Sequence, residues 1–218
     1  MKREPSSDKF FIGRVSGKIG ELKEYGGYSI FLKGFLRYFL YRFLRLKYHF
    51  HKWHLTPVEW RPYALETVRY INGLSQKENL STIVEIGCGT GDILAGLKIK
   101  KRIGVDIEDE VIRLAKLMHP DIVFKTGSFN DVRGEDIDVL ITVNFIHGID
   151  PKELSGYYDL LLKNNKIKYV CVDSVHSQYD CDFDRLFQNL VLKTEKVYEK
   201  GGFKSGRKIL VYKIINES

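Results

Sequence analysis

The sequence predicts an α/β fold in which a mostly parallel sheet carries helices on both faces. From residue 81 onward, short apolar runs alternate with stretches of helical periodicity, the pattern of strand–helix–strand units. The last two apolar runs flank Gly201-Gly202, which indicates an antiparallel pair of strands joined by a glycine turn. We therefore expect parallel strands first and an antiparallel strand at the end.

Each element follows from its own pattern. Before the first strand, Thr56-Pro57-Val58-Glu59 has the form of a capping box and predicts a helix start. Pro62 restarts that helix, and Asn72-Gly73 is a natural stop. Strands are expected at 82–86, 102–106, 122–125, 137–143, 167–173, 192–199 and 208–215, and helices at 92–98, 108–118, 151–163 and 182–190.

The N-terminal quarter is expected to be an addition to this domain. Residues 1–27 are polar and basic with little periodicity, which predicts a mobile arm. Residues 28–60 form a helical cap rich in aromatic and basic residues, and residues 61–218 form the α/β domain. All of the excess positive charge lies early: residues 1–60 hold 12 Lys and Arg against 5 Asp and Glu, whereas residues 61–218 hold 23 of each.

Three interpretations fit the aromatic helix of residues 28–55. It could cap the α/β domain, lie in the interface of an anionic membrane, or form a homo-oligomer contact. Five basic residues interrupt its apolar face, so it is not expected to span a membrane. A broad basic face for nucleic acid is not expected, because the α/β part is neutral. Cysteine usage and the N-terminal sequence favour a reduced, cytoplasmic protein, which could also bind peripherally to the inner face of a membrane.

A glycine-rich turn is the clearest binding motif. The apolar run ending in Glu85 is followed by Gly87-Cys88-Gly89-Thr90-Gly91 and then by a helix-like pattern. Glycines let the backbone approach a ligand closely, and the helix start offers free N–H groups. The spacing differs from the dinucleotide fingerprint, and the phosphate loop is absent. Asp106 ends the second strand and would lie beside this turn if the two strands are parallel neighbours. Its carboxylate could then accept both hydroxyls of a ribose.

Four motifs in order resemble the class I S-adenosylmethionine-dependent methyltransferases. They are Glu85–Gly91, Gly104–Ile107, Gly127–Asn130 and Asp138–Asn144, and the resemblance covers about residues 60–215. It implies a Rossmann-like seven-stranded methyltransferase sheet with an antiparallel last strand. It also implies S-adenosyl-L-methionine as cofactor, bound by Glu85, Gly87, Cys88, Gly89, Gly91, Asp106, Ile107, Ser128, Phe129 and Asn144. Arg61 or Tyr63 is a candidate for the methionine carboxylate. No metal site is expected, because no cluster has metal-ligand spacing.

Candidate catalytic residues follow the fourth and fifth strands. Methyl transfer from a sulfonium needs alignment, and an alcohol acceptor must also lose a proton. His147 is the first candidate for that base, because histidine titrates near neutrality. His176 is the second and Asp173 the third.

The expected activity is methyl transfer to an oxygen of a small or carrier-linked acceptor, such as a sugar or a polysaccharide or lipid precursor. The stretches Trp53-His54-Leu55 and Arg61–Ala64 resemble methyltransferases of bacterial surface-polysaccharide clusters. The motif Asp/Asn-Pro-Pro-aromatic, common in methylases of DNA bases and glutamine, is missing after the fourth strand. The alternatives are a nucleic-acid or protein methyltransferase that uses the basic arm, and a non-catalytic cofactor-binding module.

Overall fold

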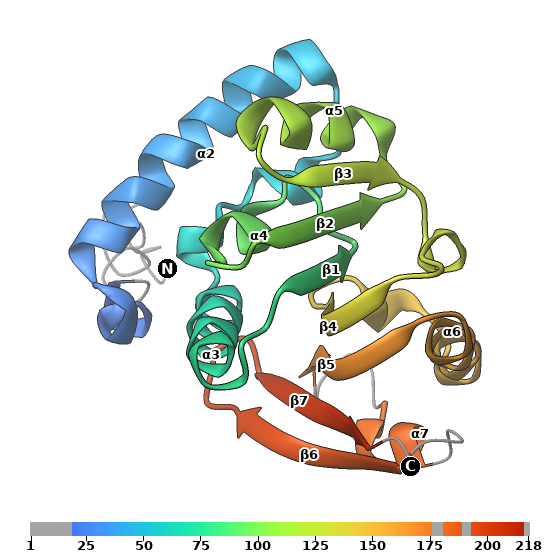
Figure 1. The fold of residues 1–218 in the computed structure, drawn as a ribbon. Coiled ribbons are helices and arrows are strands. Elements are labelled where there is room, and N and C mark those ends of the chain that lie inside the picture. The colour runs from blue at the N-terminus through green and yellow to red at the C-terminus, as the bar shows by residue number, and fades with distance from the viewer. Residues whose placement is uncertain (1–18, 176–180, 189–192, 216–218) are drawn as a thin grey trace, which may run out of the picture.

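A seven-stranded sheet organises the molecule (Figure 1). The structure is a computed structural model and describes residues 19–175, 181–188 and 193–215. The strand order is β3-β2-β1-β4-β5-β7-β6; β1 to β5 are parallel, and β7 runs antiparallel to both of its neighbours. The strands are β1 (Thr82–Ile86), β2 (Lys101–Asp106), β3 (Val123–Thr126), β4 (Asp136–Thr142), β5 (Lys166–Val175), β6 (Lys193–Lys200) and β7 (Arg207–Ile215). The predicted α/β class and the antiparallel last strand are confirmed.

Helices cover both faces of this sheet, as expected. The apolar sides of α3 (Pro62–Glu78), α4 (Asp92–Gly96) and α5 (Asp109–Met118) join one core cluster, and those of α6 (Pro151–Asn164) and α7 (Phe183–Gln188) join the other. The sheet supplies alternate residues to each, since successive side chains of a strand point to opposite faces. Val84 and Val105 thus belong to one cluster, whereas Ile83 belongs to the other. Two packed faces leave the strand ends as the place for a ligand.

The chain before β1 differs from the sequence prediction in two ways. The predicted capping box at residue 56 does not form: a short 3-10 turn, η3 (Val58–Trp60), follows Pro57 without a side-chain cap, and the long helix α3 begins at Pro62. That helix also continues through Asn72-Gly73, the predicted stop. Asn72 instead uses its side chain to accept from Lys98 N at 2.8 Å and to donate to Gly96 O at 3.0 Å. Tertiary contacts have therefore overridden a local stop signal.

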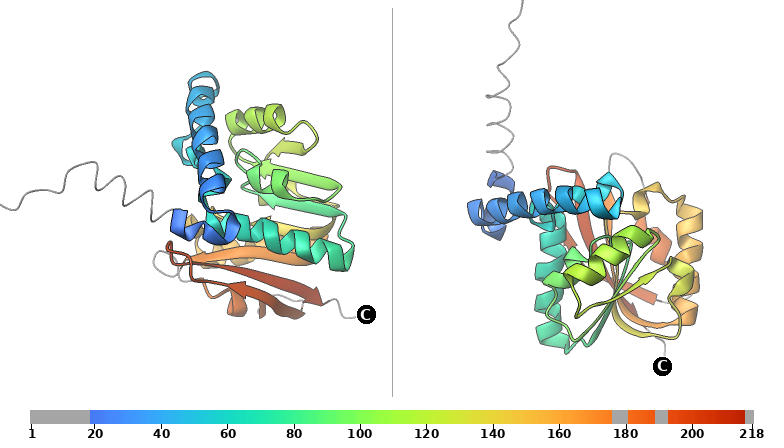
Figure 2. Two further views of the ribbon diagram at one scale, coloured as in Figure 1. Left: turned by 90° about the vertical axis from the view of Figure 1, so that its left-hand side faces the viewer. Right: turned by 90° about the horizontal axis from the view of Figure 1, so that it is seen from above.

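The N-terminal cap is one long helix with short turns on either side. After η1 (Lys23–Tyr25), α2 (Tyr28–Tyr48) runs along the outside of α5 and η3, and η2 (Lys52–Leu55) returns the chain to the domain (Figures 1 and 2). Part of the predicted arm is packed: Leu22 is buried, and the Tyr25 hydroxyl donates to Glu66 at 2.7 Å. The predicted arm over residues 1–18 lies outside the described residues.

Candidate functional site

The glycine turn after β1 is too tight for larger residues. Gly87 and Gly89 have φ of 71° and 52°, in the left-handed region that side chains disfavour. A Cβ on Gly87 would lie 2.3 Å from the Phe145 ring. The amide of Gly89 donates to Asp106 Oδ2 at 2.8 Å, which ties the turn to the end of β2. The backbone therefore forms a close-fitting wall at the carboxyl ends of β1 and β2.

One cavity of ≈ 1420 Å³ opens beside this wall. Its volume exceeds the range of roughly 300–1,000 Å³ typical of ligand pockets, so it has room for two reactants. Gly91 does not line it, because this residue is the N-cap of α4, and its φ of 77° and the Phe124 ring account for the glycine. The other predicted binding residues do line it: Glu85, Gly87, Cys88, Gly89, Asp106, Ile107, Ser128, Phe129 and Asn144. The catalytic candidate His147 lines it as well.

The residues of the β2 and β3 ends differ in what they can offer. Ile107 is 78% exposed, which leaves an open apolar face at the cavity. Each Asp106 oxygen already accepts one backbone N–H, from Gly89 and from Glu108, and keeps a second lone pair for a ligand. Phe129 is buried, and its ring stacks on Tyr157 at 4.7 Å between centroids, so it mainly supports the wall.

A buried carboxyl group and a partly exposed guanidinium line the same cavity, and each has a buried polar atom without a hydrogen bond. Glu85 Oε2 and Arg61 Nε have no hydrogen-bond partner among the described residues. Burial raises the pKa of Glu85 well above its usual range, despite the nearby Arg61 charge. Buried polar atoms are normally paired, and leaving one unpaired costs about 1–3 kcal/mol. The pair therefore fits a ligand that carries both a cationic donor and an anionic acceptor.

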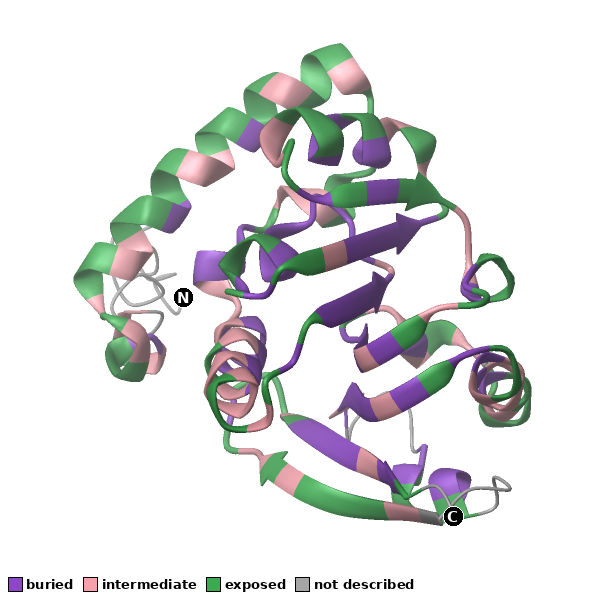
Figure 3. Ribbon diagram, in the orientation of Figure 1, coloured by how far each residue is buried: buried purple, intermediate pink, exposed green. Residues whose placement is uncertain are grey.

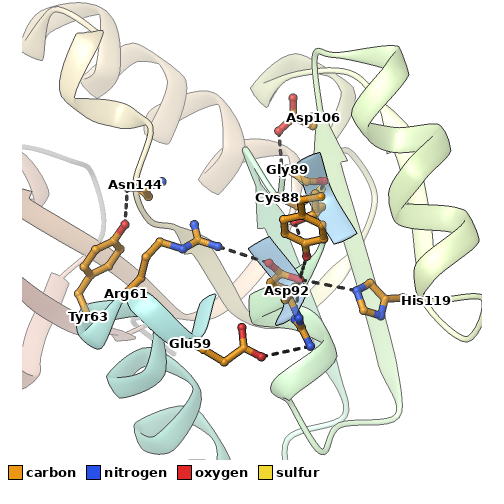
Figure 4. Close-up of polar contacts among 12 residues, drawn as sticks. Glu59, Arg61, Tyr63, Cys88, Gly89, Asp92, Asp106, His119 and Asn144 are labelled. Carbon is orange, nitrogen blue, oxygen red and sulfur yellow. Dashed lines mark hydrogen bonds and ion pairs between the residues drawn. The ribbon is translucent and has the colours of Figure 1, made fainter. Parts of the chain in front are cut away.

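Asp92, directly after the glycine turn, anchors the N-terminal cap (Figure 4). Tyr41 donates to Asp92 Oδ1 at 2.6 Å, Arg37 donates to the same oxygen at 3.0 Å, and Arg61 lies 3.6 Å from Oδ2. Burial acts to raise the pKa of Asp92, but His119, Arg37, Arg61 and Tyr41 together lower it to about 2. His119 stands 3.9 Å away, beyond normal hydrogen-bond reach, so we ascribe more of the lowering to the arginines and Tyr41.

The end of the cap also reaches the glycine turn, through a contact between His54 and Glu108 whose acidic partner the sequence did not predict. His54 Nε2 lies 2.9 Å from Glu108 Oε2, and His51 N donates to the same carboxylate. A Cβ on Gly89 would lie 2.8 Å from His54 Nδ1, so the ring lies directly against the turn. Trp53, 76% exposed, lines the cavity beside it. The cap therefore forms one wall of the cavity.

The far side of the cavity is built from side chains after β4 and β5. Asn144 has φ of 80°, and its backbone N–H donates to Asp173 Oδ1 at 2.8 Å. Its side-chain oxygen accepts from the Tyr63 hydroxyl at 2.7 Å (Figure 4). His147 Nε2 lies 3.0 Å from Asp173 Oδ2 and 2.8 Å from Arg207 Nη1. The imidazole therefore has a buried carboxylate behind it and faces the cavity.

The three catalytic candidates have different positions. His147 lines the cavity and is partly exposed. Asp173 is fully buried, does not line the cavity and is held by Asn144, His147 and Arg207. His176 lies outside the described residues.

Arg207 is the main residue that sequence reasoning missed. It pairs with Asp173 and lies over the Tyr63 ring, 4.5 Å from its centroid. Burial raises the pKa of Tyr63, which therefore stays neutral and donates. A signal was present: β7 is antiparallel, so its first residue lies at the same sheet edge as the ends of β4 and β5. Topology therefore brings Arg207 to the site.

Comparison with known proteins places the fold. No protein-family model matches the sequence, and no curated protein matches it significantly. Solved structures match the fold. Magnesium protoporphyrin IX methyltransferase from Synechocystis PCC 6803, with bound SAM, has a TM-score of 0.56 at 13% identity over 77% of this chain and 86% of its own. A TehB-like SAM-dependent methyltransferase from Corynebacterium glutamicum gives 0.56 at 15% identity over 70% and 88%.

A third solved structure, the methyltransferase domain of bacterial CtHen1, gives a TM-score of 0.55 at 15% identity over 67% of this chain and 95% of its own. The seven-stranded arrangement is the Rossmann-like methyltransferase fold.

Proposed function

We propose that the protein is an S-adenosylmethionine-dependent methyltransferase that acts on an oxygen of a small or carrier-linked acceptor. One observation supports this methyl donor: Glu85 and Arg61 line the same cavity. Their atoms Oε2 and Nε are buried there and have no hydrogen-bond partner among the described residues. The amino-acid end of this donor has an ammonium and a carboxylate. Arg61 would bind the carboxylate and Glu85 would face the ammonium, which satisfies both groups.

The remaining donor contacts follow from the same wall. Asp106 keeps one lone pair on each oxygen for the two ribose hydroxyls, and the exposed Ile107 offers an apolar face to the adenine. The glycine turn brings the backbone within contact distance of the ligand. The fold neighbours support this assignment, because one of those compared was solved with bound SAM and another is a SAM-dependent methyltransferase.

The donor supplies an electrophilic methyl group on a sulfonium, and the protein's task is to align the acceptor and take its proton. His147 is the proposed base. With one proton on Nε2, donated to Asp173 Oδ2, the imidazole keeps its other nitrogen free for the acceptor hydroxyl. Asp173 holds the ring in place by accepting this proton, and Arg207 acts through its ion pair with Asp173. The proposed acceptors are sugar-like or lipid-linked hydroxyls, which would share the cavity of ≈ 1420 Å³ with the donor.

Calorimetry tests the donor assignment. We expect S-adenosylhomocysteine to bind and NAD to give no heat. Arg61→Gln should weaken the binding of S-adenosylhomocysteine about 10- to 100-fold, because a hydrogen bond to a charged group contributes about 1.5–3 kcal/mol. The affinity for 5′-methylthioadenosine should not change, because that nucleoside lacks the amino-acid end. Arg69→Gln, at a half-exposed arginine that pairs with Glu66, is the matched control.

Two results would overturn the donor assignment. One is heat from NAD alone; the other is an equal loss of affinity for S-adenosylhomocysteine and 5′-methylthioadenosine in Arg61→Gln. Transfer of labelled methyl from S-adenosylmethionine to a cell extract tests turnover. Label in protein or nucleic acid, with none in small or lipid-extractable products, would contradict the acceptor class. Donor binding with no transfer to any extract fraction would indicate the binding-module alternative.

A further inference from the structure

A stripe of large apolar side chains faces outward along α2. No described residue covers it, and its members are strongly exposed: 65% for Leu36, 69% for Phe43 and 75% for Leu46. Figure 3 shows the outward side of α2 as exposed along most of its length. At the helical repeat, the members fall within an arc of roughly 140°. This α2 stripe consists of Tyr28, Leu32, Phe35, Leu36, Phe39, Leu40, Phe43 and Leu46.

The stripe is held outward because the opposite side of α2 is fixed to the domain. Gly34 is buried against Trp60, and a Cβ there would lie 2.3 Å from the indole Nε1. Tyr41 is fully buried and bonded to Asp92. The helix therefore cannot rotate to bury the stripe without breaking both contacts.

Basic side chains border the stripe. Lys33 lies at one border and Arg42 at the other, and Lys47 lies near the C-terminal end; all three are exposed. The sequence from Tyr25 to Val58 contains six Lys and Arg and no Asp or Glu. An apolar face flanked by basic residues matches an anionic bilayer surface, where the long cationic stems reach the lipid phosphates while the rings enter the headgroup layer.

The same charges disfavour a second copy of the chain as the occupant. A two-fold contact puts the same surface on both sides, so the stripe of one copy would face the stripe of the other. Lys33, Arg42 and Lys47 would then meet like charges, with no acid in the segment to neutralise them. None of the helices in the described residues is both long and apolar enough to cross a membrane.

We propose that the α2 stripe docks the protein on the surface of an anionic lipid bilayer, with α2 lying in the plane of the interface. The chain leads directly from α2 into η2, where exposed Trp53 lines the cavity. Docking would thus hold the rim of the cavity at the headgroups, within reach of an acceptor carried by the membrane. This inference concerns location and does not depend on the donor or on methyl transfer.

Vesicle flotation of the full chain tests the docking. The wild type should float with phosphatidylcholine vesicles that contain phosphatidylglycerol and stay behind with pure phosphatidylcholine. Leu36→Ser/Phe43→Ser should lower the partition coefficient at least about tenfold, because two large side chains no longer enter the headgroup layer. Lys33→Gln/Arg42→Gln should lower it about 25-fold, at about fivefold per basic residue.

The matched control removes exposed apolar residues elsewhere. Val123 and Ile215 are 50% and 40% exposed and lie at the edge of the sheet opposite the cavity. Val123→Ser/Ile215→Ser should float like the wild type, and all variants should keep the wild-type melting temperature. No flotation of the wild type, or equal flotation of the stripe and control variants, would overturn the proposal. So would a wild-type dimer that Leu36→Ser/Phe43→Ser makes monomeric, since the stripe would then be a self-interface.

Discussion

Two segments of this chain face the same cavity and are built on different principles. The glycine turn after β1 presents backbone, with positive φ and no room for a Cβ at Gly87. The segment after β4 presents side chains, Asn144 and His147, held by partners from β5, α3 and β7. A backbone site can be identified from a short local motif, because its residues are adjacent in sequence. A side-chain site depends on residues that only the fold brings together.

The largest predicted effect separates the two segments. His147→Ala should lower the rate of methyl transfer about 10²- to 10⁴-fold, the usual contribution of a general base. The dissociation constant of S-adenosylhomocysteine should change less than about twofold, because the donor wall is untouched. Single-turnover transfer of labelled methyl measures the first value and calorimetry the second. A variant that loses donor affinity and rate together would show that the segments are not separable.

Asp92 tests whether the glycine turn also holds the cap. Asp92→Asn removes the carboxylate shared by Arg37 and Arg61, which among the described residues leaves Arg37 only its ion pair with Glu59 at 3.2 Å. It should lower the free energy of unfolding about 3–5 kcal/mol in urea denaturation. Asp159→Asn, which breaks an exposed pair with Lys163, is the control and should cost less than about 1 kcal/mol. Equal costs would mean that the Asp92 cluster does not anchor the cap.

Acid titration sharpens the same test. The pKa of Asp92 in the folded state, about 2, lies below its ordinary value of 3.8. The ionised form is therefore favoured by folding, so this stabilisation is present above about pH 4 and is lost as the pH falls toward 2. Wild type should lose about 2 kcal/mol more than Asp92→Asn across that window. Parallel pH profiles for the two proteins would contradict the ionised assignment.

The smallest effect concerns the support of Asn144. Tyr63→Phe keeps the ring under Arg207 and removes only the hydroxyl that donates to Asn144. We expect a loss of about 0.5–1.5 kcal/mol in transition-state stabilisation, or about two- to tenfold in kcat/KM. Tyr70→Phe, at a partly buried tyrosine of α3 that stacks on Tyr198, is the control and should leave kcat/KM unchanged. An effect of Tyr70→Phe as large as that of Tyr63→Phe would point to a general change in α3.

The predicted strands agree closely with the structure because each is a short apolar run between turn residues. β1 matches the predicted range, and the other six strand positions differ by one or two residues at their ends. The predictions failed where distant contacts outweighed local signals. Asn72-Gly73 lies inside α3 because the rest of the helix packs on the sheet, and Leu22 is buried where an arm was expected.

The candidate site divides in the same way. The wall after β1 and β2 was predicted because glycines and an acid stand at the ends of consecutive strands. Arg207, the Asp92 cluster and the His54–Glu108 contact were not predicted. Arg207 lies 60 residues from His147 along the chain, and Arg37 lies 55 residues from Asp92. No local pattern encodes separations of that size.

The sequence by itself determined the order of strands and helices along the chain, the antiparallel end of the sheet and the backbone wall of the cavity. These depend on hydrophobic periodicity and on glycines, which act over a few residues. Only the tertiary structure decided that Asp173 is buried behind His147, that the cap closes over the glycine turn, and that one face of α2 stays outside. Those facts follow from packing between distant elements, where burial and charge pairing select one arrangement among many that the local sequence allows.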